Sequence, residues 1–280
     1  MFYLLKSFIQ MKILLKNNDL NEALSGLSNI GFVPTMGGLH NGHISLIKKS
    51  LRYCNKTIVS IFVNPTQFND KDDFKKYPRN VKKDLKILKK LKVNFVYLPK
   101  KQQIYNSRNK IKIHLSKKDK ILCAKYRKGH FEGVIDVMTR LTEKIKPTKI
   151  FMGEKDFQQL SLVKRFIENI YNSKIVSCKT IRDKNMLALS SRNILLNKND
   201  LIKAGQISKN LISFKKKLSK KIISKKLILI KKDKLEKKYN INIEYLEIRK
   251  KKNLQLSNKL EKSKIFVAYY LSGIRLIDNF

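Results

Sequence analysis

The stretch FVPTMGGLHNGH, residues 32–43, constrains the fold more than any other part of the chain. Its apolar start and Gly-Gly turn predict a buried strand, and the apolar spacing of residues 44–49 predicts a helix. His40 and His43 therefore lie where a strand passes into a helix, a position at which open α/β sheets bind ligands and helix amides favour phosphate. The pattern predicts a phosphate-binding turn, although a hydrogen-bonded turn histidine together with a glycine required for packing would also fit it.

Strands and helices alternate through the first part of the chain, which predicts an α/β fold with a Rossmann-like parallel sheet flanked by helices and right-handed crossovers. Apolar, β-branched segments predict strands at 31–35, 57–63, 93–98, 150–152 and 174–178. Helical spacing predicts helices at 11–27, 41–53, 81–90, 133–146 and 157–169. The alternation in residues 110–115 indicates a short additional strand.

The pattern changes near Thr180. A helix is predicted at 198–218 and strands at 242–248, 265–271 and 274–277, whereas the Lys-dense segment 215–238 fits no recognisable motif. We therefore expect a Rossmann-like domain over residues 1–180 and a smaller α+β domain over residues 181–280.

The net charge of +42 first suggests a nucleic-acid or membrane partner. Only 10 of the 63 basic residues are Arg, however, and the Lys residues are spread along the whole chain. Readers of nucleic-acid sequence depend on Arg for bidentate base contacts. We expect a solvated Lys-rich surface, with no nucleic-acid or membrane partner, and a charge-driven binding protein remains the alternative.

Three widely spaced cysteines, Cys54, Cys123 and Cys178, form no disulfide or metal pattern, which indicates reduced thiols and a cytoplasmic protein. Residues 1–15 lack a cleavage site, and no apolar run has transmembrane length. The sequence contains no zinc, P-loop or nucleophile-elbow motif, so we expect no protein-bound metal.

Three polar loops could form a site with this turn. Gly153-Glu154-Lys155-Asp156 follows a predicted strand, with Lys155 suited to phosphate and Asp156 to ribose hydroxyls. Ser190 to Asn193 could close on a polyphosphate, and residues 127–133 could face an anion. Each is also compatible with a structural role, as a helix cap, a common polar loop or a turn.

In this order, the motifs resemble those of the pantothenate synthetase (pantoate–β-alanine ligase) family, within the H-x-G-H nucleotidyltransferases. The resemblance rests on segments 32–43, SIFVNPTQF (60–68), YPRN (77–80), KGHFEGV (128–134), FMGEKDFQQL (151–160), LALSSRN (187–193) and RLIDN (275–279). It implies ATP-dependent condensation of pantoate with β-alanine through a pantoyl adenylate, releasing AMP and pyrophosphate. It also implies a homodimer, Mg²⁺ with the ATP, and a C-terminal lid domain.

The resemblance implies roles for individual residues. His43, His40 and Lys155 would be catalytic. Pantoate and β-alanine would be bound by residues including Gln67, Gln159, Asn64 and Arg127. ATP would be bound by Met36, Gly37, Gly38, Leu39, His40, Asn41, Gly42, His43, Gly153, Glu154, Lys155, Asp156, Ile181, Leu189, Ser190, Ser191 and Arg192.

The chain departs from the family pattern at several positions. Asn185-Met186 replaces an Asp-Gly pair, Asp136 replaces a Thr, and Lys82-Lys83 lies where the family is often acidic. These departures bear on the 183–189 loop and on any protein ligand for Mg²⁺. Another adenylate-forming nucleotidyltransferase with a different acid substrate is the rival enzyme, and Gln67 with Gln159 favours pantoate.

Overall fold

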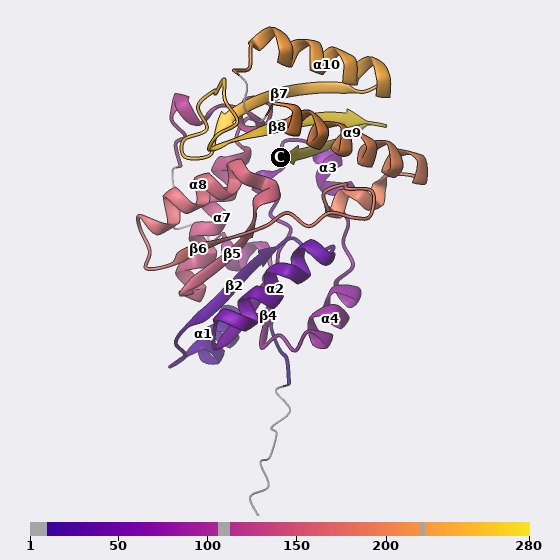
Figure 1. Ribbon diagram of the computed structural model, residues 1–280. Coiled ribbons are helices and arrows are strands. Elements are labelled where there is room, and N and C mark those ends of the chain that lie inside the picture. The colour runs from indigo at the N-terminus through magenta and orange to yellow at the C-terminus, as the bar shows by residue number, and fades with distance from the viewer. Residues whose placement is uncertain (1–9, 106–112, 219–221) are drawn as a thin grey trace, which may run out of the picture.

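The computed structural model describes residues 10–105, 113–218 and 222–280, and its centre is a parallel sheet of six strands (Figure 1). The strand order is β1-β4-β3-β2-β5-β6. The strands are β1 (Lys12–Leu14), β2 (Ile30–Thr35), β3 (Lys56–Ile61), β4 (Phe95–Tyr97), β5 (Lys149–Gly153) and β6 (Lys174–Cys178). The chain runs outward from β2 to β3 and β4 on one side and continues through β5 and β6 on the other. The topological switch point therefore lies between β2 and β5, where α/β sheets bind ligands.

Helices cover both faces of this sheet. Phe32 on β2 packs in a core with α1 (Asn17–Leu24), α7 (His130–Ile145) and α8 (Phe157–Glu168). Its neighbour Val33 packs in a separate core with α2 (Asn41–Tyr53) and α4 (Val81–Lys90). Successive side chains of a strand point to opposite faces, so a two-sided core requires a nearly continuous apolar strand. The fold class predicted from the alternation of strands and helices is confirmed.

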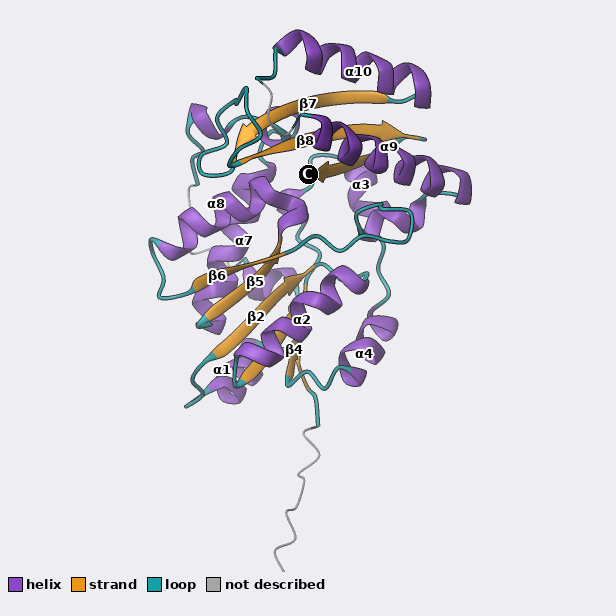
Figure 2. Ribbon diagram, in the orientation of Figure 1, coloured by secondary structure: helices purple, strands orange, loops and turns teal. Residues whose placement is uncertain are grey.

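An antiparallel sheet of three strands follows, formed by β7 (Asn242–Lys250), β8 (Ser263–Leu271) and β9 (Ile274–Asn279). Its outer face packs against α9 (Lys198–Lys217) and α10 (Lys225–Tyr239), which lie over the sheet in Figure 2. Its inner face packs on the core of the parallel sheet and its helices. In this contact Phe266 on β8 meets Phe157 with ring centroids 5.9 Å apart. The small sheet thus lies beyond the carboxyl ends of the large one.

Two predictions of secondary structure need correction. The helix predicted over 11–27 is wrong at its start, because Lys12–Leu14 forms the edge strand β1, paired with Phe95–Tyr97. Three residues are too few for periodicity to distinguish a strand from a helix. In the strand predicted at 110–115, residues 110–112 lie outside the described residues and 113–115 form no strand. The Lys-dense segment 215–238 contains the end of α9 and most of α10.

In the described ranges, none of the helices combines the length and apolar character needed to cross a membrane.

Candidate active site

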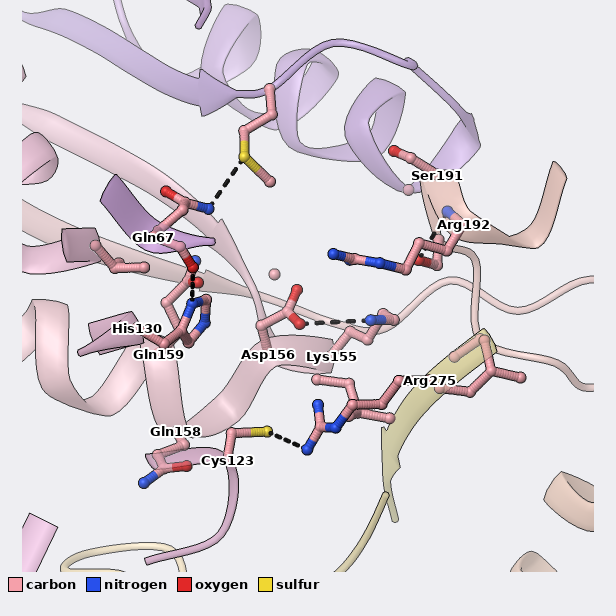
Figure 3. A pocket seen from close by; sticks show the side chains of 18 of the residues that line it. Gln67, Cys123, His130, Lys155, Asp156, Gln158, Gln159, Ser191, Arg192 and Arg275 are labelled. Carbon is pink, nitrogen blue, oxygen red and sulfur yellow. Dashed lines mark hydrogen bonds and ion pairs between the residues drawn. The ribbon is translucent and has the colours of Figure 1, made fainter. Parts of the chain in front are cut away.

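A cavity of about 590 Å³ lies between the carboxyl edge of the parallel sheet and the antiparallel sheet. Figure 3 shows side chains from both bodies converging on it. Most of the predicted site residues line it: Met36, His40, Gly42, His43, Asn64, Gln67, Arg127, Gly153, Lys155, Asp156, Gln159, Ile181, Leu189, Ser190, Ser191 and Arg192. Gly37, Gly38, Leu39, Asn41 and Glu154 do not line it.

The Gly-Gly turn after β2 is held from behind by a buried carboxylate. Asp84, 1% exposed, accepts hydrogen bonds from the amides of Gly38 (2.9 Å) and Leu39 (2.8 Å). Gly37 and Gly38 have φ of 78° and 62°, a left-handed conformation that glycine adopts without strain. These amides are therefore engaged by Asp84, which the sequence analysis did not identify as a site residue.

The two imidazole rings are in contact at the start of α2, with centroids 4.2 Å apart and planes tilted by 41°. His40 is the N-cap, and its Nδ1 accepts the amide hydrogen of Gly42 at 3.1 Å, which places the imidazole proton on Nε2. A Cβ at residue 42 would lie 2.7 Å from His40 Cε1, so the glycine in H-x-G-H makes room for this ring.

Both histidines are neutral at pH 7. Burial and the Lys155 charge lower the pKa of His40 to about 4. Burial and the neighbouring His40 lower the pKa of His43 to about 3. Neutral imidazoles donate a hydrogen bond without adding positive charge, so His40 and His43 contribute no cation to the site.

The loop after β3 is joined to the start of α7 through polar contacts. Asn64 Nδ2 donates to Gln67 Oε1 at 3.2 Å and to the carbonyl of Gly133 at 3.1 Å. His130 Nδ1 lies 2.6 Å from the carbonyl of Gln67, and its Nε2 lies 3.1 Å from Arg127 Nη1. Burial and the Arg127 charge lower the pKa of His130 to about 3, so the neutral ring donates through Nδ1 and accepts from Arg127. His130 thus holds both the Gln67 carbonyl and the Arg127 side chain in place.

The segment after β5 presents an ion pair to the cavity. Lys155 Nζ lies 3.4 Å from Asp156 Oδ1. Burial opposes ionisation of Asp156, but the Lys155 and Arg192 charges hold its pKa below the usual value. Asn279 on β9 donates to the carbonyls of Glu154 (2.8 Å) and Lys155 (2.9 Å), so the antiparallel sheet positions this segment. Asn279 lies in the RLIDN segment, but its sequence pattern predicts no role for this residue.

Glu154 turns away from the cavity and accepts a hydrogen bond from Ser177 at 2.7 Å, with Lys264 at 3.5 Å. The Ser177 hydroxyl and the Lys264 charge keep the pKa of Glu154 below its usual value, against the effect of burial. Glu154 therefore links β6 and β8 to this segment and does not line the cavity.

The loop before α9 reaches across to the turn after β2. Ser191 Oγ donates to the carbonyl of Gly38 at 3.0 Å. Arg192 forms a bidentate pair with Asp73 on α3 (Lys71–Lys76), with the Nη2–Oδ2 distance at 2.8 Å. At the base of the loop, Arg182 pairs with the buried Asp278 at 2.6 Å. The loop is thus attached both to the parallel-sheet part of the chain, through Gly38 and Asp73, and to the antiparallel sheet, through Asp278.

Two positions at which the chain departs from the family pattern, Met186 and Asp136, differ in what the structure shows for them. Met186 has φ of +70°, a conformation that costs less with glycine. Asp136 accepts a hydrogen bond from Arg140 Nε at 2.7 Å, one helical turn away, and does not line the cavity.

Together, the open parallel sheet, the switch-point cavity and the histidine turn define a nucleotide-binding type of α/β site. The sequence model of the family described as Pantoate-beta-alanine ligase matches residues 10–280, and the chain belongs to this family. The curated Pantothenate synthetase of Flavobacterium psychrophilum is 40% identical over 266 residues, covering 93% of this chain and 94% of that protein.

Solved structures agree. The chain is similar to the Pantothenate Synthetase from Thermus thermophilus, with a TM-score of 0.90, 29% identity, and coverage of 96% of this chain and 99% of that one. It is also similar to a Francisella tularensis Pantoate-beta-alanine Ligase complexed with beta-gamma ATP and beta-alanine, with a TM-score of 0.82, 36% identity, and coverage of 96% and 97%. The predicted family is confirmed.

Proposed function

We propose that this chain uses ATP to condense pantoate with β-alanine, forming pantothenate through a pantoyl adenylate. The observation that carries the proposal is membership of the ligase family over residues 10–280. In the first step a pantoate carboxylate oxygen attacks the α-phosphorus and pyrophosphate leaves with the bridging oxygen. In the second, the β-alanine nitrogen attacks the acyl carbon, loses a proton, and AMP leaves.

In this proposal the cavity aligns the reactants and stabilises charge. His40 and His43 donate neutral hydrogen bonds to phosphate oxygens, while Lys155 and Arg192 supply positive charge. Ser190, Ser191 and the 181–189 segment close over the nucleotide. Gln67 and Gln159 bind pantoate, with Asn64 and Arg127 beside them. Because Gly37, Gly38 and Leu39 stand behind the cavity wall, their proposed part is to shape the turn.

Mg²⁺ finds no dedicated protein cage in the described ranges, where no cluster of three or more His, Cys, Asp or Glu side chains could hold a metal ion. Three carboxylates in and behind the cavity wall are already engaged, Asp84 by two amides, Asp156 by Lys155 and Asp73 by Arg192. Mg²⁺ usually keeps several waters and binds substrate phosphates, so we propose that it arrives with ATP.

The test is exchange of labelled pyrophosphate into ATP by the purified protein, with and without pantoate and before β-alanine is added. The expected result is exchange that depends on pantoate. Lys155→Ala should reduce the exchange rate by about 10²-fold, because a preorganised charge is lost. Lys234→Ala on the outer face of α10 is the matched control and should leave the rate unchanged. Exchange without pantoate would contradict the acid substrate.

We also propose a two-domain division near residue 180, a homodimer and a cytoplasmic location. The division is supported by an apolar core composed only of residues after 181, between α9, α10 and the antiparallel sheet. Light scattering tests the dimer, limited proteolysis tests the boundary, and cell fractionation tests the location. A monomeric mass would contradict the dimer, and cleavage elsewhere would contradict the boundary near residue 180. Recovery with membranes would contradict the cytoplasmic location.

A further inference from the structure

Asp73 is a carboxylate shared by two arginines of the cavity wall. Arg192 binds it through Nε (3.1 Å to Oδ1) and Nη2 (3.0 Å to Oδ1 and 2.8 Å to Oδ2). Arg127 Nη2 lies 3.9 Å from Oδ2. The three residues come from separate segments: Asp73 from α3, Arg192 from the loop before α9, and Arg127 from the turn before α7. Asp73 therefore connects segments that are far apart in the sequence.

Asp73 is itself held in place. Its short helix α3 is anchored by an aromatic cluster in which Phe68 meets Phe74 and Tyr77 edge to face, with ring centroids 5.3 Å and 5.6 Å apart. Tyr77 also lies under Arg192, whose guanidinium carbon is 5.3 Å from the ring centroid. Arg192 is thus fixed by a carboxylate at one edge and a ring against one face, both from the 68–77 segment.

This geometry leaves one nitrogen of Arg192 for the cavity. Asp73 takes Nε and Nη2, and Nη1 makes no hydrogen bond to any residue in the described ranges. In Figure 3 the guanidinium extends over Lys155 and Asp156. A planar fork held at one edge has little freedom, so less conformational entropy is lost when the remaining nitrogen binds an anion.

We propose that Asp73 is a positioning residue that holds Arg192 ready for the phosphates of the nucleotide. This proposal rests on the function proposed above. It differs from the simple electrostatic expectation, because a carboxylate beside an anion site should weaken anion binding through its charge. Positioning and plain charge therefore predict opposite signs when Asp73 is neutralised.

The experiment measures pyrophosphate affinity by calorimetry, so that it needs no turnover, together with the KM values for ATP and pantoate. We expect Asp73→Asn to weaken pyrophosphate binding by about 10-fold. This loss lies between the small effect of breaking an exposed ion pair and the large effect of breaking a buried one. The KM for ATP should rise similarly, with little change in the KM for pantoate. Asp73→Glu keeps the charge and should recover part of the loss. Asp72→Asn, the same charge change one residue away, should leave binding equal or slightly tighter.

A double-mutant cycle tests whether Asp73 acts through Arg192. In an Arg192→Gln background, Asp73→Asn should change pyrophosphate affinity by less than about 2-fold, since coupled residues are not additive. Tighter binding by Asp73→Asn alone would overturn the inference and show that Asp73 competes with phosphate. An undiminished effect without Arg192 would also overturn it, as would failure of the wild type to bind pyrophosphate. Pyrophosphate binding with this coupling, but no pantoate-dependent exchange, would sustain the inference and reject only the proposed reaction.

Discussion

The cavity has two sides that are built on different physical principles. The histidine side, formed by the turn after β2 and the start of α7, contains the partly buried His40 and His43 and the buried His130, and its imidazoles are neutral. The arginine side is formed by helix α3 and by the loop that precedes α9. It is held by the ion pair between Arg192 and Asp73, whose side chains are 24% and 31% exposed. Buried polar groups depend on fixed hydrogen bonds, whereas partly exposed ion pairs tolerate rearrangement and are screened by salt. The first side should therefore resist salt and be lost in acid as its imidazoles gain protons, whereas the second side should weaken as salt is added.

The largest expected effect is acid destabilisation through His130. Its pKa is 6.5 unfolded and about 3 in the fold. Between these values the unfolded chain binds a proton that the folded chain does not, so the free energy of unfolding falls as pH decreases from 6.5 toward 3. The loss from this one residue is on the order of 4 kcal/mol.

The check is urea denaturation at several pH values. His130→Asn should be less stable at pH 7 and show a shallower decline in acid, by up to about one bound proton. The exposed His114, changed to Asn, is the matched control and should keep the wild-type slope. Parallel slopes for His130→Asn and the wild type would contradict a neutral buried His130.

The next effect concerns Asp84 behind the Gly-Gly turn. Asp84→Ala leaves the partly buried amide of Gly38 and the buried amide of Leu39 without an acceptor, so the free energy of unfolding should fall by about 3 kcal/mol. Asp233→Ala on the exposed face of α10 should change it by less than about 0.5 kcal/mol. Urea denaturation at pH 7 measures both. An Asp84→Ala protein as stable as its control would show that the turn does not need this carboxylate.

A smaller, local effect is expected at Gly42. Gly42→Ala places a Cβ against His40 Cε1 at 2.7 Å, so the ring must move and its hydrogen bond to the residue 42 amide is strained. Pyrophosphate exchange should slow by about 10-fold, because alignment is lost. In a His40→Ala background the same change should cost little. An equal cost in both backgrounds would mean that the methyl group acts on something other than His40.

The smallest effect belongs to the arginine side, at the base of its loop. Met186→Gly relieves a left-handed backbone at φ +70° but adds freedom to the unfolded chain. The net gain in the free energy of unfolding should be about 0.5 kcal/mol. Met186→Ala keeps a Cβ and should show no such gain. Thermal denaturation of both variants measures the difference, and equal values would remove strain as the explanation.

Much of the architecture could be predicted from the sequence, because apolar strands and amphipathic helices have distinct periods. The exception is β1, where three residues give no period and pairing with β4 decides the conformation. Likewise, most of the site residues predicted from motifs line the cavity. The motifs could not identify Asp84, Asp73 or Asn279 as partners, because these contacts join residues 45 to 125 positions apart. Nor could they predict neutral histidines, since a pKa depends on burial that only the folded chain defines.

The contact from Asn279 to the carbonyls of Glu154 and Lys155 also affects how the protein is made. The cavity joins residues from the turn at 36 to strand β9, which follows every other strand and helix described in the chain. During synthesis the parallel sheet can form while later residues are still within the ribosome, since domains generally fold as units from the N-terminus. The Lys155 segment receives its support from Asn279 only when β9 emerges. The site is therefore completed only after β9 has been made, and until then the Lys155 segment lacks the hydrogen bonds from Asn279.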